Sequence, residues 1–426
     1  MRKTEYPNIG ETLYTDTLPN GLRLCVVPKK GFRSFFAAFA VDYGGDCRSF
    51  TLDGQPWHTP AGVAHYLEHK MFDMPDGDNA LNLLNANGAD PNAFTGNDMT
   101  CYYFQCTERF EENLRLLLHF VSTPYFTEET VQKEQGIITQ EILMGEDDPG
   151  NRIFYNLLEQ LYAHHPLRER IAGTVESIRE ITPEVLHSCY RAFYTPANMC
   201  LCVEGDVDPE QVSRIAREIL GSERASVPQP DFGEPEVGLL PAEAMRREAM
   251  AVSAPQFLIG AKFESEKEGE ALLRQRLVSQ LALRLLVGAS SPFYTRLYAE
   301  GLLNRDFDYE SDFISGTASL FIGGESEEPE KVFEALQQEA ARVAAEGFPA
   351  ERFERAKRAS LGARLRGLED FGNVCISLAS GVFENYGSLD AFAMLDQVTK
   401  SECEAFVRDV FSPGRLAISI IEPKKD

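Results

Sequence analysis

Two stretches of this 426-residue chain repeat one another, and the repeat restricts the fold more than any other feature. Residues 181–196 match residues 398–413 at a constant offset of 217, and an apolar, β-prone run follows each copy. A second pair, Phe126-Thr-Glu-Glu and Phe348-Pro-Ala-Glu, recurs at an offset of 222. Such internal repetition indicates a duplicated unit. We therefore predict an α+β chain of two duplicated α/β domains, each a mostly antiparallel mixed sheet covered by helices.

The expected boundary between these domains lies at residues 222–247, where prolines and acidic residues accumulate. Segments of this composition are typical of linkers. The chain is also longer than one hydrophobic core usually spans. We expect a first domain at residues 1–221, a linker at 222–247 and a second domain at 248–426.

The charge and the cysteines exclude several classes of protein. The formal net charge of −25 disfavours nucleic acid as a partner, because nucleic-acid binding needs basic surface. The same charge indicates solubility or, alternatively, a preference for basic or neutral partners. No apolar run reaches the ~18 residues of a membrane span, and no signal peptide opens the chain. The nine scattered cysteines fit neither a zinc knuckle nor a disulfide framework, so we expect a cytoplasmic, reduced protein with no membrane partner.

The pentapeptide His65-Tyr66-Leu67-Glu68-His69 reads H-x-x-E-H, the inverse of the H-E-x-x-H pattern of zinc proteases. Thr59 and Pro60 are suited to the N-cap and the first position of a helix that carries it. Helical spacing places Val63, Leu67 and Met71 on one side of this helix. The two histidines and Glu68 then lie together on the other side. The alternative is a polar helix face with two hydrogen-bonded histidines.

A second helix is predicted over residues 127–146, with Thr127 as its cap. Its apolar stripe is expected to contain Val131, Ile137, Ile138 and Ile142, with Glu134 and Glu141 in the middle of it. A buried carboxylate is costly unless it is paired or bound to a metal ion. These two acids therefore indicate a metal site, or else a helix edge where they reach solvent or a basic neighbour.

Together the two helices supply the groups of a catalytic zinc site. Such a site takes three protein ligands, and histidines at i and i+4 can both reach one ion. Glu68 can take the proton of the bound water as the water attacks a carbonyl group. Glu141 is the best candidate for the third ligand, and Glu134 can orient a histidine.

The chain resembles the pitrilysin/insulinase family of zinc metallopeptidases, and within it the two-domain bacterial subunits similar to mitochondrial processing peptidase. Four motifs carry the resemblance: His65 to His69, Asn92-Ala93-Phe94-Thr95, Tyr102-Tyr103-Phe104 and Glu134-x6-Glu141. The resemblance implies Zn²⁺ as the cofactor, with His65, His69 and Glu141 as ligands. It implies Glu68 as general base and Glu134 as a supporting acid. It also implies that Asn92, Ala93, Phe94 and Thr95 form an edge strand that pairs with an extended peptide substrate.

The second half of the chain lacks this chemistry. The positions that match Glu134 and Glu141 hold Ala356 and Ala363, and all seven histidines lie at or before residue 187. Members of the family with a complete active site place an Arg and a Tyr, seven apart, in the opposite half. The matching positions here are Leu297 and Asn304, with Arg296 and Tyr298 out of register. A sister subunit that lacks H-x-x-E-H is therefore expected to supply them, so we favour a heterodimer over a homodimer.

These features predict the catalytic subunit of a zinc endopeptidase that hydrolyses short or unfolded peptides in a closed chamber. Two alternatives stay open: a non-proteolytic binding or assembly subunit of the same fold, and a homodimeric peptidase that needs no partner.

Overall fold

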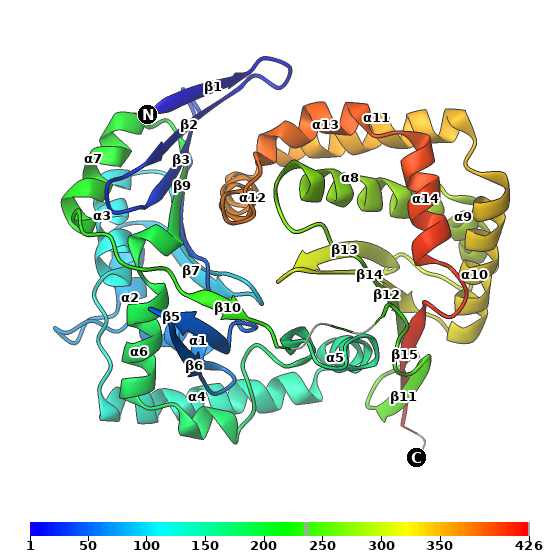
Figure 1. Ribbon diagram of the computed structural model, residues 1–426, viewed down its shortest axis with the longest axis horizontal. Coiled ribbons are helices and arrows are strands. Elements are labelled where there is room, and N and C mark those ends of the chain that lie inside the picture. Colours follow the sequence, from blue (N-terminus) through cyan, green and yellow to red (C-terminus); the bar gives the residue numbers. More distant parts are fainter. Residues whose placement is uncertain (234–235, 237, 425–426) are drawn as a thin grey trace. The chain divides into compact units, whose positions relative to one another are not determined.

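A computed structural model of the chain describes residues 1–233, 236 and 238–424, so residues 234, 235 and 237 of the expected linker lie outside the described part. The chain divides into two compact units, each built from several segments (Figure 1). The first contains residues 1–142, 169–233 and 365–389, and the second contains residues 143–168, 234–364 and 390–426. Each unit is described by itself below.

The first unit is built on a seven-stranded sheet with helices on both faces. The strand order is β1-β2-β3-β9-β4-β8-β7, and only β3 and β9 pair in parallel among these neighbours. The strands are β1 (Arg2–Tyr6), β2 (Glu11–Thr17), β3 (Arg23–Pro28), β4 (Phe35–Val41), β7 (Ala89–Thr95), β8 (Thr100–Cys106) and β9 (Met199–Gly205). A turn that contains Asn20 and Gly21 joins β2 to β3. Strand β7 is the outermost strand of the sheet, next to β8.

Helices cover this sheet because each has a buried apolar side. Figure 1 shows α12 on one face of β9 and α3 and α7 on the other. The helices of this unit are α1 (Val63–Lys70), α2 (Ala80–Ala86), α3 (Phe110–Val121), α4 (Glu128–Asp147), α6 (Pro183–Phe193), α7 (Pro209–Leu220) and α12 (Phe371–Phe383). A small separate sheet contains β10 (Gln229–Asp231), β5 (Ser49–Leu52) and β6 (Gln55–His58), in that order.

The second unit repeats the topology of the first. Its sheet has the order β11-β15-β12-β14-β13, which corresponds strand for strand to β3-β9-β4-β8-β7 and again contains one parallel pair, β11 with β15. The strands are β11 (Met245–Met250), β12 (Gln256–Phe263), β13 (Asp308–Ile314), β14 (Thr317–Glu325) and β15 (Ala417–Pro423). The helices are α5 (Pro149–Leu161), α8 (Gly269–Leu286), α9 (Pro292–Ala299), α10 (Pro329–Glu346), α11 (Ala350–Gly367), α13 (Ala391–Gln397) and α14 (Lys400–Val410). The predicted fold class and the duplication are both confirmed.

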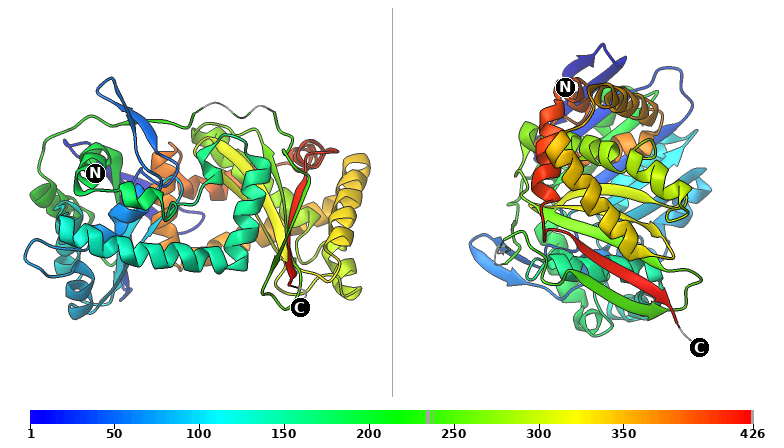
Figure 2. Two further views of the ribbon diagram at one scale, coloured as in Figure 1. Left: turned by 90° about the horizontal axis from the view of Figure 1, so that it is seen from below. Right: turned by 90° about the vertical axis from the view of Figure 1, so that its right-hand side faces the viewer.

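The units are not the contiguous segments 1–221 and 248–426 expected from the sequence. Helix α12, from the second half of the chain, packs on β9 and β4 of the first sheet. Helix α5, from the first half, packs on β15 and β12 of the second sheet. Each sheet therefore has one face covered by a helix from the other half. The expected linker also contains β10 and the first three residues of β11, and each of these strands is paired with another strand (Figure 2).

Two further expectations concern membranes and cysteines. No helix among the described residues is long and apolar enough to cross a membrane. All nine cysteines are buried thiols without a disulfide. Cys200 and Cys202 lie on the fully buried strand β9, as core thiols should.

Glu204, on the same strand, is a fully buried carboxylate, and it generates a testable prediction. Burial raises its pKa to about 8 from an ordinary value of 4.5, although the Lys29 ammonium at 3.2 Å opposes the shift. The unfolded chain releases this proton at lower pH than the folded chain does. The free energy of unfolding should therefore fall as pH rises from about 4.5 to about 8. In Glu204→Gln this part of the pH dependence should disappear. Urea unfolding at a series of pH values between about 4.5 and about 8 measures the effect. The control is the exposed Glu210→Gln, and equal pH dependence in Glu204→Gln and the wild type would contradict the prediction.

Candidate metal centre

Helix α1 presents the pentapeptide because its other side is buried. Val63, Tyr66 and Leu67 are almost inaccessible to solvent, and the Tyr66 hydroxyl donates a hydrogen bond to the backbone carbonyl of Val131 on α4. This contact fixes the motif helix against the helix that carries the two glutamates. The histidines and Glu68 remain partly exposed on the opposite side of α1.

The start of α1 corrects one sequence prediction. The helix begins at Val63 and not at Pro60, and Gly62 precedes it with a left-handed φ of 97°. A Cβ atom at Gly62 would lie 2.6 Å from the Ala172 carbonyl oxygen, so a side chain there would clash. Thr59 is no N-cap, because its hydroxyl donates to the carbonyl of Arg48.

His65, His69 and Glu141 come together on facing helices. His65 Nε2 lies 3.3 Å from Glu141 Oε1, and His69 Nε2 lies 3.5 Å from Glu141 Oε2. One ligand atom from each of the three residues lies within 4.8 Å of the other two. The two imidazoles are 4.6 Å apart between ring centroids. The structure therefore brings together the three residues that the sequence selects as metal ligands.

The spacing of these atoms fits zinc. Zinc binds imidazole nitrogen and carboxylate oxygen at about 2.0–2.2 Å with tetrahedral geometry, which separates two ligand atoms by about 3.3–3.5 Å. The two measured nitrogen–oxygen distances lie in that interval. Two neutral imidazoles and one carboxylate also leave one coordination position open, as in catalytic zinc sites. Without a metal ion, this arrangement puts two ring nitrogens against one carboxylate.

Glu134 contacts His69 from behind. Its Oε1 lies 2.9 Å from His69 Nδ1, which leaves Nε2 of that ring directed at Glu141. Burial lowers the pKa of His69, but the hydrogen bond and charge of Glu134, with the charges of Glu68 and Glu141, raise it overall. Burial raises the pKa of Glu134, but the hydrogen bond and charge of His69, with the charges of Lys70 and Lys133, lower it overall. A carboxylate in this position fixes the tautomer and orientation of a metal-binding histidine.

Glu68 points at strand β7. Its Oε2 accepts a hydrogen bond of 2.7 Å from the Thr95 hydroxyl, and the Thr100 hydroxyl lies 3.4 Å from that of Thr95. The carboxylate is thus oriented by the strand whose residues 92–95 are predicted to bind substrate. The link between Glu68 and Thr95 could not be predicted from the sequence, because it depends on the packing of α1 beside β7.

The exposure of the side chains on α4 differs from the prediction that both glutamates lie within a buried apolar stripe. Val131, Ile138 and Ile142 are buried, but Ile137 is 49% exposed, so its assignment to the buried stripe is wrong. The side chain of Glu134 is 15% exposed and that of Glu141 is 51% exposed. Burial therefore makes an unpaired carboxylate costly at Glu134 but not at Glu141. Thr127 caps the helix as predicted, since its hydroxyl oxygen accepts from the Thr130 amide.

The two positions where the family's Arg and Tyr are expected, Leu297 and Asn304, lie on α9 and just after it, in the second unit. Leu297 is buried and Asn304 Nδ2 donates to Glu325 at 3.2 Å. Arg296 and Tyr298 are exposed on α9. Neither matching position holds an Arg or a Tyr.

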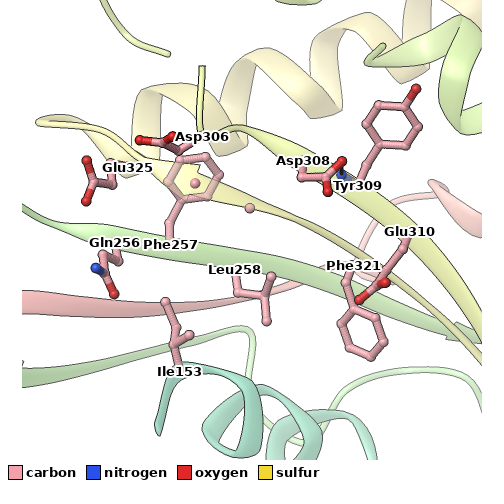
Figure 3. A pocket seen from close by; sticks show the side chains of 12 residues that line it. Ile153, Gln256, Phe257, Leu258, Asp306, Asp308, Tyr309, Glu310, Phe321 and Glu325 are labelled. Carbon is pink, nitrogen blue, oxygen red and sulfur yellow. Dashed lines mark hydrogen bonds between the residues drawn. The ribbon is translucent and has the colours of Figure 1, made fainter. Parts of the chain in front are cut away.

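A cavity of about 390 Å³ in the second unit contains none of the predicted site residues. Figure 3 shows the carboxylates of Asp306 and Glu325 on one side, those of Asp308 and Glu310 on the other, and Leu258 between them. Burial raises the pKa of Glu310, as do the neighbouring acidic groups. Both acidic and apolar side chains line the cavity, and its negative charge favours ligands with basic groups.

Comparisons with known proteins identify the family of the chain. A protein-family model described as insulinase (peptidase family M16) matches residues 58–175, and one described as peptidase M16 inactive domain matches residues 180–360. YmfH of Bacillus subtilis, described as an uncharacterized zinc protease, is 36% identical over 430 residues, which covers 100% of both chains. A solved protein from Alicyclobacillus acidocaldarius, described as M16-like, is 32% identical with a TM-score of 0.93 and covers 99% of this chain and 100% of its own. Pitrilysin has a TM-score of 0.78 at 17% identity, with 100% of this chain and 46% of its own covered, which shows a shared fold.

The contact between Glu134 and His69 predicts the effect of removing it. Glu134→Ala should weaken zinc binding about 10- to 100-fold, because His69 loses the group that orients it. Competition with a zinc chelator measures this change. The matched control is Glu128→Ala, an exposed acid in the first turn of the same helix. An unchanged affinity in Glu134→Ala would show that His69 is oriented by other contacts.

Proposed function

This chain belongs to the insulinase, or pitrilysin, family of M16 peptidases, and from that premise we propose that it is a zinc-dependent endopeptidase. It acts on short or unfolded peptides as the catalytic subunit of a pair. The observation that carries the proposal is the convergence of His65, His69 and Glu141, with one ligand atom of each within 4.8 Å of the other two and Glu68 on the same helix face. The relatives described as zinc proteases support the choice of metal.

The proposed ligands are His65, His69 and Glu141. Zinc bound there supplies Lewis-acid chemistry, which polarises a carbonyl group and makes water more acidic. Glu134 holds His69 by its Nδ1 atom so that Nε2 stays available.

Glu68 is proposed to move the proton. Its carboxylate accepts a proton from the water that attacks the peptide carbon, and it can then deliver that proton to the leaving amine. The Thr95 hydroxyl holds one oxygen of this carboxylate at 2.7 Å. The other oxygen is left for the reacting groups.

The substrate is proposed to bind as an added strand. Strand β7 is the outermost strand of its sheet, with β8 on one side, so the described residues leave its other edge without a partner strand. An extended peptide that paired with residues 92–95 would lie next to the residue that contacts Glu68. Backbone pairing is independent of side chains, which suits a peptidase acting on short or unfolded peptides.

A sister subunit is proposed to complete the site and close the chamber. Leu297 and Asn304 stand where the Arg and Tyr of the family are expected, and neither side chain can donate a charged or phenolic contact to a substrate. A partner chain that lacks H-x-x-E-H would supply those groups. A homodimer and a non-proteolytic binding subunit are the competing outcomes.

Glu68→Gln tests the proposed chemistry. The variant should keep zinc but lose peptide cleavage, because glutamine cannot accept the proton. Zinc content and cleavage of a peptide library are measured, with Glu129→Gln at an exposed site of α4 as the control. The assay is run with the chain alone and with the product of a sister gene lacking H-x-x-E-H, where only the pair should reach full activity. A Glu68→Gln protein that cleaves at the wild-type rate would falsify the role of Glu68, and full activity of the chain alone would favour the homodimer.

Thr95→Val tests the orientation of Glu68. Valine keeps the shape of threonine but removes the hydrogen bond to Glu68. The free energy of a hydrogen bond to a charged group corresponds to about a tenfold fall in kcat when the bond is lost. Zinc content should not change. Thr95→Ser keeps the hydroxyl and should restore most of the rate. If Thr95→Val were as active as Thr95→Ser, the hydrogen bond would have no part in catalysis.

A further inference from the structure

A second cavity of the second unit lies among three helices and a strand. Its volume is about 380 Å³, within the range of small-molecule sites. Figure 1 shows α11 and α13 next to α8, with β13 beyond. The lining residues from α8 are Leu277, Gln280, Leu281 and Arg284; the others are Tyr309 on β13, Ser360, Ala363 and Arg364 on α11, and Leu395 on α13.

This cavity occupies the place in the second unit that the metal centre occupies in the first. Helix α8 follows β12 and precedes the β13–β14 hairpin, as α1 follows β4 and precedes the β7–β8 hairpin. Helix α8 contacts β13 as α1 contacts β7. Helix α11 corresponds to α4, and Ala363, which matches Glu141, lines the cavity. The cavity thus lies at the position equivalent to the metal centre, where the metal-binding groups are replaced.

The replacement reverses the charge of the recess. Arg284 and Arg364 line it, and none of its described lining residues is acidic. Arg284 is partly buried and forms no ion pair with any described residue. A partly buried guanidinium without a counter-charge is unfavourable, and a bound anion would compensate it. The net charge of −25 repels anions from the chain as a whole, so their binding requires such a local site.

The polar neighbours suit an oxygen-rich ligand. Arg364 donates to Gln280 Oε1 across the two helices, so its guanidinium is already oriented. Burial raises the pKa of Tyr309 more than Arg284 lowers it, so this hydroxyl stays protonated at neutral pH and can donate. Guanidinium groups bind carboxylate and phosphate in a planar, two-point manner.

We propose that this cavity is a binding site for a small oxyanion, a phosphate or carboxylate group held by Arg284 and Arg364 with the Tyr309 hydroxyl as a further donor. The site goes beyond the proposed peptidase function and does not depend on it, since every residue that forms it lies in the second unit.

Calorimetric titration of inorganic phosphate into the zinc-loaded chain, in chloride buffer at fixed ionic strength, tests the site. One phosphate should bind saturably, and Arg284→Gln or Arg364→Gln should each weaken binding at least about tenfold. Arg358→Gln is the matched control, because this arginine is exposed on α11 outside the cavity. Arg284→Lys keeps the charge without the planar fork and should bind with intermediate affinity, which also tests the site if Arg284→Gln fails to fold.

Phosphate could also reach the metal centre, so the titration is repeated with His65→Ala. Binding that survives in His65→Ala and is lost in Arg284→Gln supports the cavity. The titration is also performed with succinate in place of phosphate, which shows which oxyanion the site prefers; whichever binds must bind more weakly to Arg284→Gln. Binding that is lost in His65→Ala but intact in Arg284→Gln overturns the proposal. The proposal is also overturned if neither phosphate nor succinate binds saturably to the wild type.

Discussion

The packing of the motif helix against the glutamate helix is the constraint on which the candidate site depends. One side of α1 is buried, and the Tyr66 hydroxyl ties it to the backbone of α4 at Val131. Because side chains project from a helix at fixed angles, burying that side directs His65 and His69 at α4. Glu134 and Glu141 then meet the two rings from one helix, seven residues apart. The geometry of the metal centre is therefore a consequence of core packing.

The duplication explains why one scaffold holds two equivalent positions of opposite charge. Both units have the same strand order and one parallel pair at the same place, so the position where the first helix contacts the edge hairpin is the same in each. In the first unit this position contains histidines and acids. In the second it contains two arginines, with Ala363 in place of a carboxylate. Strand pairing and helix burial do not use the histidines and acids of the first unit or the two arginines of the second, so these polar groups can diverge without loss of the fold.

Much of the fold could be predicted because local patterns and tertiary contacts agree there. Strands β4, β8 and β9 are short apolar runs, and the Asn20-Gly21 turn joins a hairpin. The failures have tertiary causes. The start of α1 is fixed by the close approach of Ala172 to Gly62, although these two residues are more than a hundred positions apart in the sequence. Ile137 is apolar but exposed, since it lies on the same face of α4 as the two glutamates. The exchange of α5 and α12 between the units follows from no local signal, because either sheet offers an apolar face.

The sequence by itself determined the kinds of chemical group at the site, the duplication and the absence of those groups from the second half. Residue identity and spacing along one helix are enough for this, since a helix converts spacing into direction. Only the tertiary structure decided the distances from His65 and His69 to Glu141, the hydrogen bond from Thr95 to Glu68, and the recess that Arg284 and Arg364 share. Each of these joins residues on different elements, and their separation is set by how the helices and strands pack.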